Sequence, residues 1–212
     1  MKNGIIVLAL LLVGCVSLGK DTPAVMNYVL EDLAAPAQKN TAADPRSLLV
    51  LDTTASGFYD DESFAYSRAP GTRAQYQYAR WTERPGKRFS GLLQKRLAAQ
   101  SGFASVAVAG GQVRGDLVLD TELTEFYHEA DTAPGSVRVQ LRAELIDLKT
   151  RKLIGRQWFE RRVPIATYDA AGAAKGFNQA TTGVLDDLVA WLAGLPKENG
   201  VMRHNITEET LR

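Results

Sequence analysis

The chain has very little of the residue types that build covalent cross-links and metal sites. Among 212 residues there is one cysteine, Cys15, and there are two histidines, His128 and His204. A single thiol cannot form an internal disulfide and cannot supply a cysteine cluster for structural zinc. With only two imidazoles besides, we expect neither a metal site nor a bound cofactor.

An excess of charge of one sign is also lacking. The chain carries 25 Lys and Arg against 24 Asp and Glu, a net charge of +1. Because nucleic-acid-binding surfaces depend on a concentration of basic residues, the sequence excludes nucleic acid as an expected partner. With 45% hydrophobic residues, the chain has enough apolar side chains to bury a core.

The longest hydrophobic run is short. Residues 4–13 read GIIVLALLLV, ten residues without a charge, and they follow Lys2. A bilayer core needs about 20 apolar residues, whereas a positive start, a short apolar core and a small residue at its end are typical of a secretory signal. We therefore predict a signal peptide over residues 1–14. The alternative is a frayed N-terminal helix in a cytosolic protein.

The end of this run, Leu12, Val13, Gly14 and Cys15, closely resembles the lipobox of bacterial lipoprotein precursors. The resemblance implies cleavage after Gly14, attachment of diacylglycerol to the Cys15 sulfur and acylation of the new amino terminus. One acyl chain anchors a protein only marginally, whereas three hold it on a membrane. In the sorting pattern of such lipoproteins, Val16 in place of aspartate implies the outer membrane, with the protein on its periplasmic face.

Composition divides the rest of the chain into three parts. Residues 15–27 are small and polar, and we predict that they form a lipidated tether. Residues 28–196 are predicted to fold as one domain. Residues 197–212, KENGVMRHNITEETLR, are predicted to be a polar, mobile tail.

The periodicity of residues 28–196 predicts an α+β fold, in which a mainly antiparallel β-sheet packs against two amphipathic helices. Three successive segments alternate apolar and polar residues, which is typical of an antiparallel meander with one solvated face. Two segments carry apolar residues at helical spacing. The predicted strands are 28–30, 47–53, two hairpin strands within 57–81, 103–109, 115–128, 135–148 and 153–163; the predicted helices are 85–100 and 169–195.

Two local features of the helices are also predicted. The first helix is expected to expose a basic, solvated face made of Lys87, Arg88, Lys95 and Arg96. The second is expected to begin with a thin, close-packed turn because it carries small residues at positions 172 and 176.

Aromatic residues gather in residues 57–81, GFYDDESFAYSRAPGTRAQYQYARW. A turn at residues 69–72 separates two alternating segments, which predicts a hairpin with its aromatic side chains facing one another. One interpretation is a well-packed hairpin, since aromatic residues are common in strands. The other is a half-exposed surface that docks a partner protein, and its candidate residues are Tyr66, Arg68, Tyr76, Tyr78 and Trp81.

No motif predicts an active site. Ser17 and Lys20 match the S-x-x-K pattern of some serine acyl enzymes, but they lie in the predicted tether, where nothing rigid positions them. His128 has no nucleophile motif near it and is expected at the surface. The acidic residues 60–62 are expected to cap or solvate a turn. The sequence therefore predicts a protein that is not an enzyme.

Taken in order, these features resemble the auxiliary lipoprotein family of ABC-type lipid transport systems, which includes paraquat-inducible protein C. The matching elements are the early strand at 28–30, the aromatic strand 64–68 ending in Arg, the tyrosines before Arg80 and Trp81, Pro85 at a helix start, and the GDLVLDTELTEF strand at 115–126.

The resemblance implies a non-catalytic periplasmic lipoprotein that works with an MCE-domain protein, a permease and an ATPase to move lipid between two membranes. The family supplies no catalytic residues to transfer, and the tail after Pro196 departs from its pattern. Homo-oligomerisation is compatible with this interpretation.

Two other hypotheses stay open at this stage. One is a structural envelope lipoprotein that supports assembly of an outer-membrane machine. The other is a hydrolase of envelope lipids or glycans, which would need a pocket joining His128 or Asp60 to a hydroxyl nucleophile.

Overall fold

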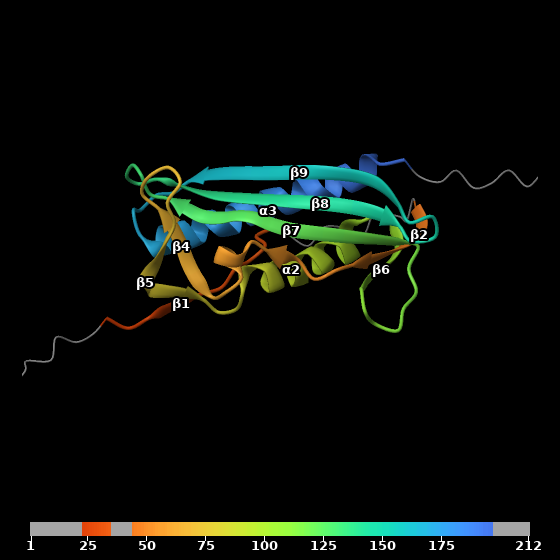
Figure 1. The fold of residues 1–212 in the computed structure, drawn as a ribbon, viewed down its shortest axis with the longest axis horizontal. Coiled ribbons are helices and arrows are strands. Elements are labelled where there is room, and N and C mark those ends of the chain that lie inside the picture. The colour runs from red at the N-terminus through yellow and green to blue at the C-terminus, as the bar shows by residue number, and fades with distance from the viewer. Residues whose placement is uncertain (1–22, 35–43, 197–212) are drawn as a thin grey trace, which may run out of the picture.

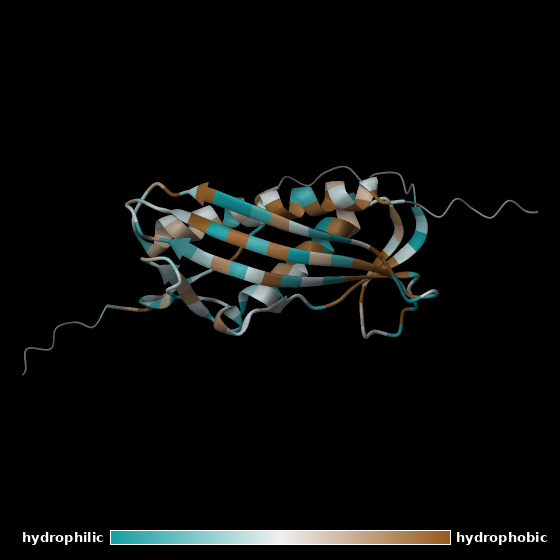
Figure 2. Cartoon of the chain, turned by 45° about the horizontal axis from the view of Figure 1, so that its top comes forward, coloured by the Kyte–Doolittle hydropathy of each residue, from teal (hydrophilic) through white to brown (hydrophobic). Residues whose placement is uncertain are grey.

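Three long strands form the body of the sheet in the computed structural model, which describes residues 23–34 and 44–196 (Figure 1). They pair antiparallel in the order β7, β8, β9. Apolar and polar residues alternate along them, as Figure 2 shows by colour, so one face of the sheet is apolar and the other polar. The predicted meander is confirmed; its strands are β7 (Leu117–Glu129), β8 (Ser136–Asp147) and β9 (Lys152–Pro164).

The free edge of β7 is covered by three short strands, one after another. β2 (Asp44–Val50), β3 (Thr54–Ala55) and β4 (Ser63–Ser67) each run parallel to β7 and pair with successive parts of it. The sheet then continues from both ends of this row. β6 (Phe103–Val108) pairs parallel with β2, β5 (Ala74–Trp81) pairs antiparallel with β4, and β1 (Met26–Tyr28) pairs parallel with β5.

Two helices cover the apolar face of the sheet. α2 (Pro85–Gln100) lies against β3 and β6, and α3 (Ala170–Gly194) lies against β8 and β9. Both contribute to one continuous core, in which Phe64 stacks on Trp81 with ring centroids 4.5 Å apart. Phe126 of β7 stacks on Phe177 of α3 at 4.3 Å. A single short turn of 3-10 helix, η1 (Gly57–Tyr59), follows β3.

The predicted fold class, one α+β domain with two amphipathic helices, is confirmed. Its sheet is mixed, because the strands joined to β7 from earlier in the chain run parallel to it. β1 begins at Met26 rather than at residue 28, and β2 begins at Asp44 rather than at residue 47. The predicted signal peptide, Cys15 and the C-terminal tail lie outside the described residues.

The first turn of α3 is as thin as the sequence predicts. A methyl group on Gly172 would lie 2.4 Å from the Thr167 carbonyl oxygen, and one on Gly176 would lie 2.7 Å from Ile165 Cγ2. The Asp169 side chain caps this end of the helix by accepting a hydrogen bond from the Gly172 N–H at 2.7 Å. The start of α3 can therefore lie close to the segment at residues 165–167 only because positions 172 and 176 carry no side chain.

The predicted basic face of α2 is wrong at one position. Arg96 is 4% exposed, and its Nε donates to Asp32 Oδ2 at 2.8 Å. The same guanidinium also binds Asp186 of α3. Although burial alone would raise the pKa of Asp32, the hydrogen bond from Arg96 lowers it. Arg96 thus joins three separate parts of the chain.

The segment around Asp32 is held by further bonds, and we call it the N-terminal clamp (Leu30 to Leu33). The N–H of Glu31 donates to Asn178 Oδ1 at 3.0 Å, and the N–H of Leu33 donates to Thr182 Oγ1 at 2.8 Å. Arg88 of α2 donates to the Leu30 carbonyl at 2.8 Å. The clamp fixes the start of the domain to both helices.

Two glycines in helices should respond in opposite ways to alanine. Gly172→Ala should lower the free energy of unfolding by about 2 kcal/mol, because the new methyl meets backbone that cannot move without disturbing the cap. Gly91→Ala in α2, with nothing within 4 Å of the new methyl, should raise it by about 0.5–1 kcal/mol. Urea unfolding of both variants measures the difference, and equal effects would contradict the close packing.

Arg96→Gln should lower the free energy of unfolding by about 3 kcal/mol, because it leaves the half-buried Asp32 carboxylate without its partner. The neighbouring exposed residue on the same helix provides the control: Lys95→Gln should change stability by no more than about 0.5 kcal/mol. Thermal and urea unfolding test this, and a mild Arg96→Gln variant would show that the clamp is held in another way.

Candidate functional site

The β4–β5 hairpin lies at one end of the long axis of the molecule, beside the turn between β7 and β8 and the end of β9 (Figure 1). The predicted hairpin is confirmed: Tyr66 pairs with Ala74 and Ala65 with Gln75. The register then shifts by the time Ser63 pairs with Arg80. This irregularity changes which β5 side chains face the core.

The hairpin's aromatic residues are consequently divided between core and surface. Trp81 is 3% exposed, so its candidacy as a binding residue is corrected: it belongs to the core. Tyr76 is half-buried, and its hydroxyl is engaged with His128. Tyr78, 36% exposed, faces solvent. Arg68 is exposed, with its guanidinium carbon 5.1 Å from the centre of the half-buried Tyr66 ring.

His128 is not a surface residue as predicted; it has no exposed area. Its Nδ1 lies 2.7 Å from the Tyr76 hydroxyl, and its Nε2 lies 3.3 Å from the Pro134 carbonyl oxygen. A carbonyl can only accept, so Nε2 carries the proton and Nδ1 accepts from Tyr76. Burial lowers the pKa of His128 and keeps the ring neutral. Both ring nitrogens are therefore occupied by structural hydrogen bonds.

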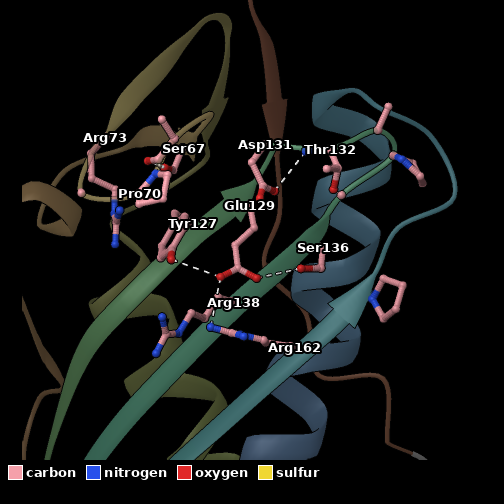
Figure 3. Close-up of a pocket in the computed structure, with 16 residues that line it drawn as sticks. Ser67, Pro70, Arg73, Tyr127, Glu129, Asp131, Thr132, Ser136, Arg138 and Arg162 are labelled. Carbon is pink, nitrogen blue, oxygen red and sulfur yellow. Dashed lines mark hydrogen bonds and ion pairs between the residues drawn. The ribbon is translucent and has the colours of Figure 1, made fainter.

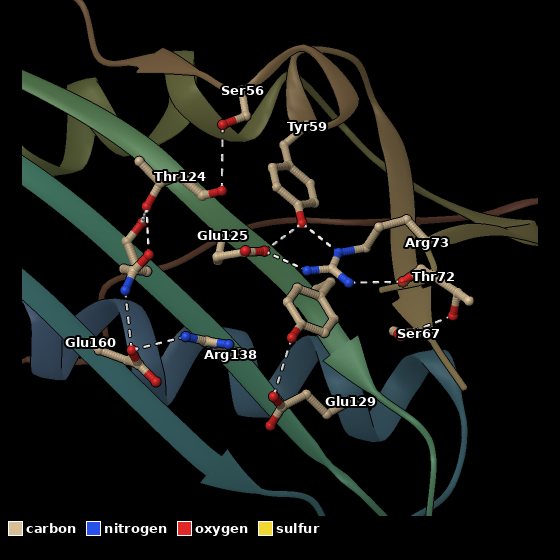
Figure 4. A network of polar contacts seen from close by, with 12 residues as sticks. Ser56, Tyr59, Ser67, Thr72, Arg73, Thr124, Glu125, Glu129, Arg138 and Glu160 are labelled. Carbon is tan, nitrogen blue, oxygen red and sulfur yellow. Dashed lines mark hydrogen bonds and ion pairs between the residues drawn. The ribbon is translucent and has the colours of Figure 1, made fainter. Parts of the chain in front are cut away.

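A polar network on the outer face ties the hairpin to β7 (Figure 4). Arg73 donates from Nε to the Tyr59 hydroxyl and from Nη2 to Glu125 Oε2, both at 2.7 Å. Tyr59 in turn donates to Glu125 Oε2 at 2.7 Å. Burial is the main reason why the pKa of the Tyr59 hydroxyl is raised. The Arg73 guanidinium also lies over the ring of Tyr127, 3.6 Å from its centre. The turn of the hairpin is thus held rigidly over the sheet.

Beneath this turn is an open pocket of about 720 Å³, which we call the arginine pocket (Figure 3). Glu129 lies on its floor: Ser136 donates to Glu129 Oε2 at 2.8 Å, and Tyr127 donates to Glu129 Oε1 at 3.2 Å. Arg162 lies 3.3 Å from the same carboxylate. The other lining residues are Ser67, Ala69, Pro70, Gly71, Arg73, Asp131, Thr132, Ala133, Pro134, Gly135, Arg138 and Pro164.

Gly135, in the turn between β7 and β8 that lines the pocket, cannot be replaced without strain. Its φ is +83°, and a methyl group there would lie 2.3 Å from the Glu129 carbonyl oxygen and 2.8 Å from His128 Nε2. Only glycine adopts this conformation and fits this space without strain. The turn that forms one wall of the pocket is thereby packed directly on the buried histidine.

The sequence did not point to this pocket. Its three arginines come from separate parts of the chain. Arg73 immediately precedes β5, Arg138 lies on β8 and Arg162 lies on β9, so they meet only once the strands are in register. The signal that was present is the alternation of β8 and β9 about a turn near residues 149–152, which places Arg138 opposite Arg162.

The described residues assemble no recognisable catalytic group. No group of three or more His, Cys, Asp and Glu side chains within residues 23–34 and 44–196 could hold a metal ion. Asp61 accepts a hydrogen bond from the Ser63 N–H at 2.8 Å, which confirms that it caps a turn. Asp60 lies 3.9 Å from Arg84. In the described part of the chain, no helix is both long and apolar enough to cross a membrane.

These features define the chain as an α+β domain with a surface hairpin and a small polar pocket at one end. A family model for the ABC-type transport auxiliary lipoprotein component matches residues 28–189. The chain belongs to this family, and it is therefore a lipoprotein that serves as an auxiliary component of ABC-type transport. Among curated proteins, no sequence matches the chain.

Several solved structures share the fold. Protein XCC0632 from Xanthomonas campestris, of the DUF330 family, is 20% identical, with a TM-score of 0.66 over 81% of this chain and 94% of its own. An uncharacterised protein is 14% identical, with a TM-score of 0.58 over 74% and 99%. The hypothetical protein CT253 from Chlamydia trachomatis is 11% identical, with a TM-score of 0.50 over 72% and 97%.

The buried histidine should make stability depend on pH. The pKa of His128 is lower in the folded protein than its ordinary value of 6.5, so the unfolded chain binds a proton that the folded chain does not. The contribution of this residue to stability should be nearly constant above about pH 7 and should be lost as the pH falls through 6.5, by at most about 1.4 kcal/mol between pH 7.5 and 5.5.

Urea unfolding across this pH range measures the fall. The matched variant is His128→Gln, whose amide can also accept from Tyr76 and donate to Pro134 but does not titrate. It should lower overall stability while flattening the profile. An unchanged slope in this variant would assign the pH dependence to other groups.

Proposed function

We propose that this protein is a non-catalytic, lipid-anchored periplasmic component of an MCE-type ABC lipid transport system. In this role it docks or stabilises the conduit between the inner and outer membranes. It is held by acyl chains on Cys15 at the periplasmic face of the outer membrane. The observation that carries the proposal is the family match over residues 28–189, which makes the chain an auxiliary component of ABC-type transport.

The first structural support is an exposed surface at the hairpin end. We call it the docking surface and define it by Val25, Met26, Tyr66, Arg68 and Tyr78. Val25 is 45% exposed and Met26 57% exposed. β1 pairs with β5 at Met26 and Ala79, so these residues lie on the strands that also carry Tyr78. Exposed apolar side chains with an aromatic and an arginine at the same end of a domain are typical of protein interaction sites. Tyr76 packs against the Tyr66 ring with centroids 4.9 Å apart, and Trp81 stacks on Phe64 in the core of the same hairpin.

The second support is rigidity. The hairpin that carries Tyr66 and Arg68 is held by the Arg73 network on one side and by the Tyr76–His128 hydrogen bond on the other. A surface that is already ordered loses little conformational entropy on binding. The geometry therefore suits docking of a partner better than it suits catalysis, for which the pocket offers no activated nucleophile.

A third support is the position of the chain that leads to the proposed anchor. β1 and the described segment that leads into it lie at the same end of the molecule as the hairpin, whereas α3 ends at the opposite end (Figure 1). A tether that continues from Pro23 would bring the hairpin end toward the membrane that holds the acyl chains.

Affinity purification of the full-length protein from its own membranes in mild detergent tests the proposal. We expect an MCE-domain protein, with its permease and ATPase, among the recovered proteins. The double variant Met26→Ser, Tyr78→Ser should reduce this recovery by about tenfold, because truncating the few residues that dominate an interface costs more than about 1 kcal/mol.

The control is Trp158→Ser, which removes an aromatic side chain that is 50% exposed on β9, away from the docking surface. It should leave recovery unchanged. Recovery of outer-membrane assembly proteins with no MCE-domain protein would contradict the proposal and favour the structural envelope lipoprotein instead.

A further inference from the structure

The arginine pocket contains two like charges placed directly opposite each other. In the register of β8 and β9, Arg138 pairs with Arg162, and both side chains lie on the polar face. Like charges directly opposite on neighbouring strands are destabilising. A pair of arginines in this arrangement is a ready site for an anion, because a bound anion removes the repulsion and receives hydrogen bonds from both.

The existing acidic partners of these arginines leave donors unused. Arg138 donates a hydrogen bond from Nη2 to Glu160 at 3.1 Å, and its side chain is 23% exposed. The Tyr127 phenol lies close enough to help raise the pKa of this guanidinium against the effect of burial. Arg162 is held only loosely, 3.3 Å from both Glu129 and Glu160, with its side chain 54% exposed.

Two carboxylates line the pocket together with the arginines, Glu129 on its floor and Asp131 at its rim. Glu129 accepts from Tyr127 and Ser136 and lies 3.3 Å from Arg162, and a carboxylate can accept about four hydrogen bonds in total. Asp131 is exposed at the rim, where one of its oxygens accepts from the Thr132 N–H at 3.0 Å. A ligand that is only anionic would meet these carboxylates, so the pocket suits a ligand that carries a positive group beside its negative one.

We propose that the arginine pocket binds a phosphodiester that carries a primary ammonium, the headgroup chemistry of phosphatidylethanolamine. The phosphate lies over Arg138 and Arg162, and the ammonium lies against Glu129 and Asp131. At about 720 Å³ the pocket is within the range of small-molecule sites, about 300–1,000 Å³. Its charged lining suits a headgroup and not an acyl chain.

The source of the ligand follows from the position of the pocket. The turn between β7 and β8 and the tip of the hairpin, which form its walls, lie at the same end of the molecule as β1 (Figure 1). In this respect the inference rests on the proposed function, which brings that end close to a membrane. The recognition chemistry depends only on the pocket.

The test uses the purified full-length chain in a phosphate-free detergent, without any transport partner. Glycerophosphoethanolamine is titrated in by calorimetry, and glycerophosphoglycerol, inorganic phosphate and ethanolamine are titrated separately. We expect saturable binding of glycerophosphoethanolamine, with each of the other three at least tenfold weaker. Equal binding of glycerophosphoglycerol would overturn the proposal, because it lacks the ammonium.

Arg162→Gln should weaken glycerophosphoethanolamine binding by about tenfold, since it removes a charge-assisted hydrogen bond on an exposed edge strand where folding is little affected. Arg156→Gln is the matched control on the same strand and face: its side chain is 52% exposed, it pairs with Glu144, and it lies outside the pocket. This variant should bind within twofold of the parent. Equal losses in the two variants would overturn the assignment of the site.

A second arm identifies the source of the headgroup. The Cys15→Ser chain, which removes the proposed acylation site, is floated with phosphatidylcholine vesicles containing either phosphatidylethanolamine or phosphatidylglycerol. Flotation only with phosphatidylethanolamine, lost in Arg162→Gln, supports a membrane lipid. Binding of the soluble headgroup without flotation would overturn that source. Both arms omit the MCE-domain protein, so their failure leaves the affinity purification result intact, and failure of that purification leaves them intact.

Discussion

The whole sheet depends on one constraint: both edges of β7 must have their backbone hydrogen bonds satisfied along thirteen residues. On one edge β8 does this in a single pass. On the other edge, β2, β3 and β4 pair with β7 one after another, and each runs parallel to it. The chain segments that connect and follow these short strands include η1 and the aromatic hairpin, and they lie at one end of β7. The arginine pocket forms because the hairpin turn lies beside the β7–β8 turn there.

Sequence patterns predicted most of this fold and little of the site. The meander and both helices follow from periodicity within one segment, which needs no knowledge of distant residues. Parallel pairing to β7 joins segments far apart in the chain, so no local pattern reveals it. Tyr78 and Trp81 show a second limit, since the irregularity between β4 and β5 changes the face on which β5 side chains lie. Arg96 shows a third: a charged residue on a helix looks solvated until its partners Asp32 and Asp186 are known.

Two regions at the hairpin end have separate chemistries. Apolar side chains on β1 and β5 are suited to another protein, whereas the paired arginines and acids under the hairpin turn are suited to a small zwitterion. His128 lies between these regions, bonded to Tyr76 of the hairpin and to Pro134 of the pocket wall. At neutral pH this buried, neutral imidazole holds the two regions at a fixed separation through its two hydrogen bonds. The docking surface and the pocket therefore share one structural support while using different residues.

The N-terminal clamp has a mechanical consequence. Any pull on the chain at Pro23 reaches the domain first through β1, which has only three residue pairs with β5. Beyond them the load passes to the bonds of Glu31, Asp32 and Leu33, which end on α2 and α3. Tension on a tether would thus load β5 of the hairpin first, through its three residue pairs with β1, and would then be spread through the clamp into both helices of the core. The ion pairs of Arg96 with Asp32 and Asp186 are therefore the contacts that pass load from the N-terminal segment to both helices.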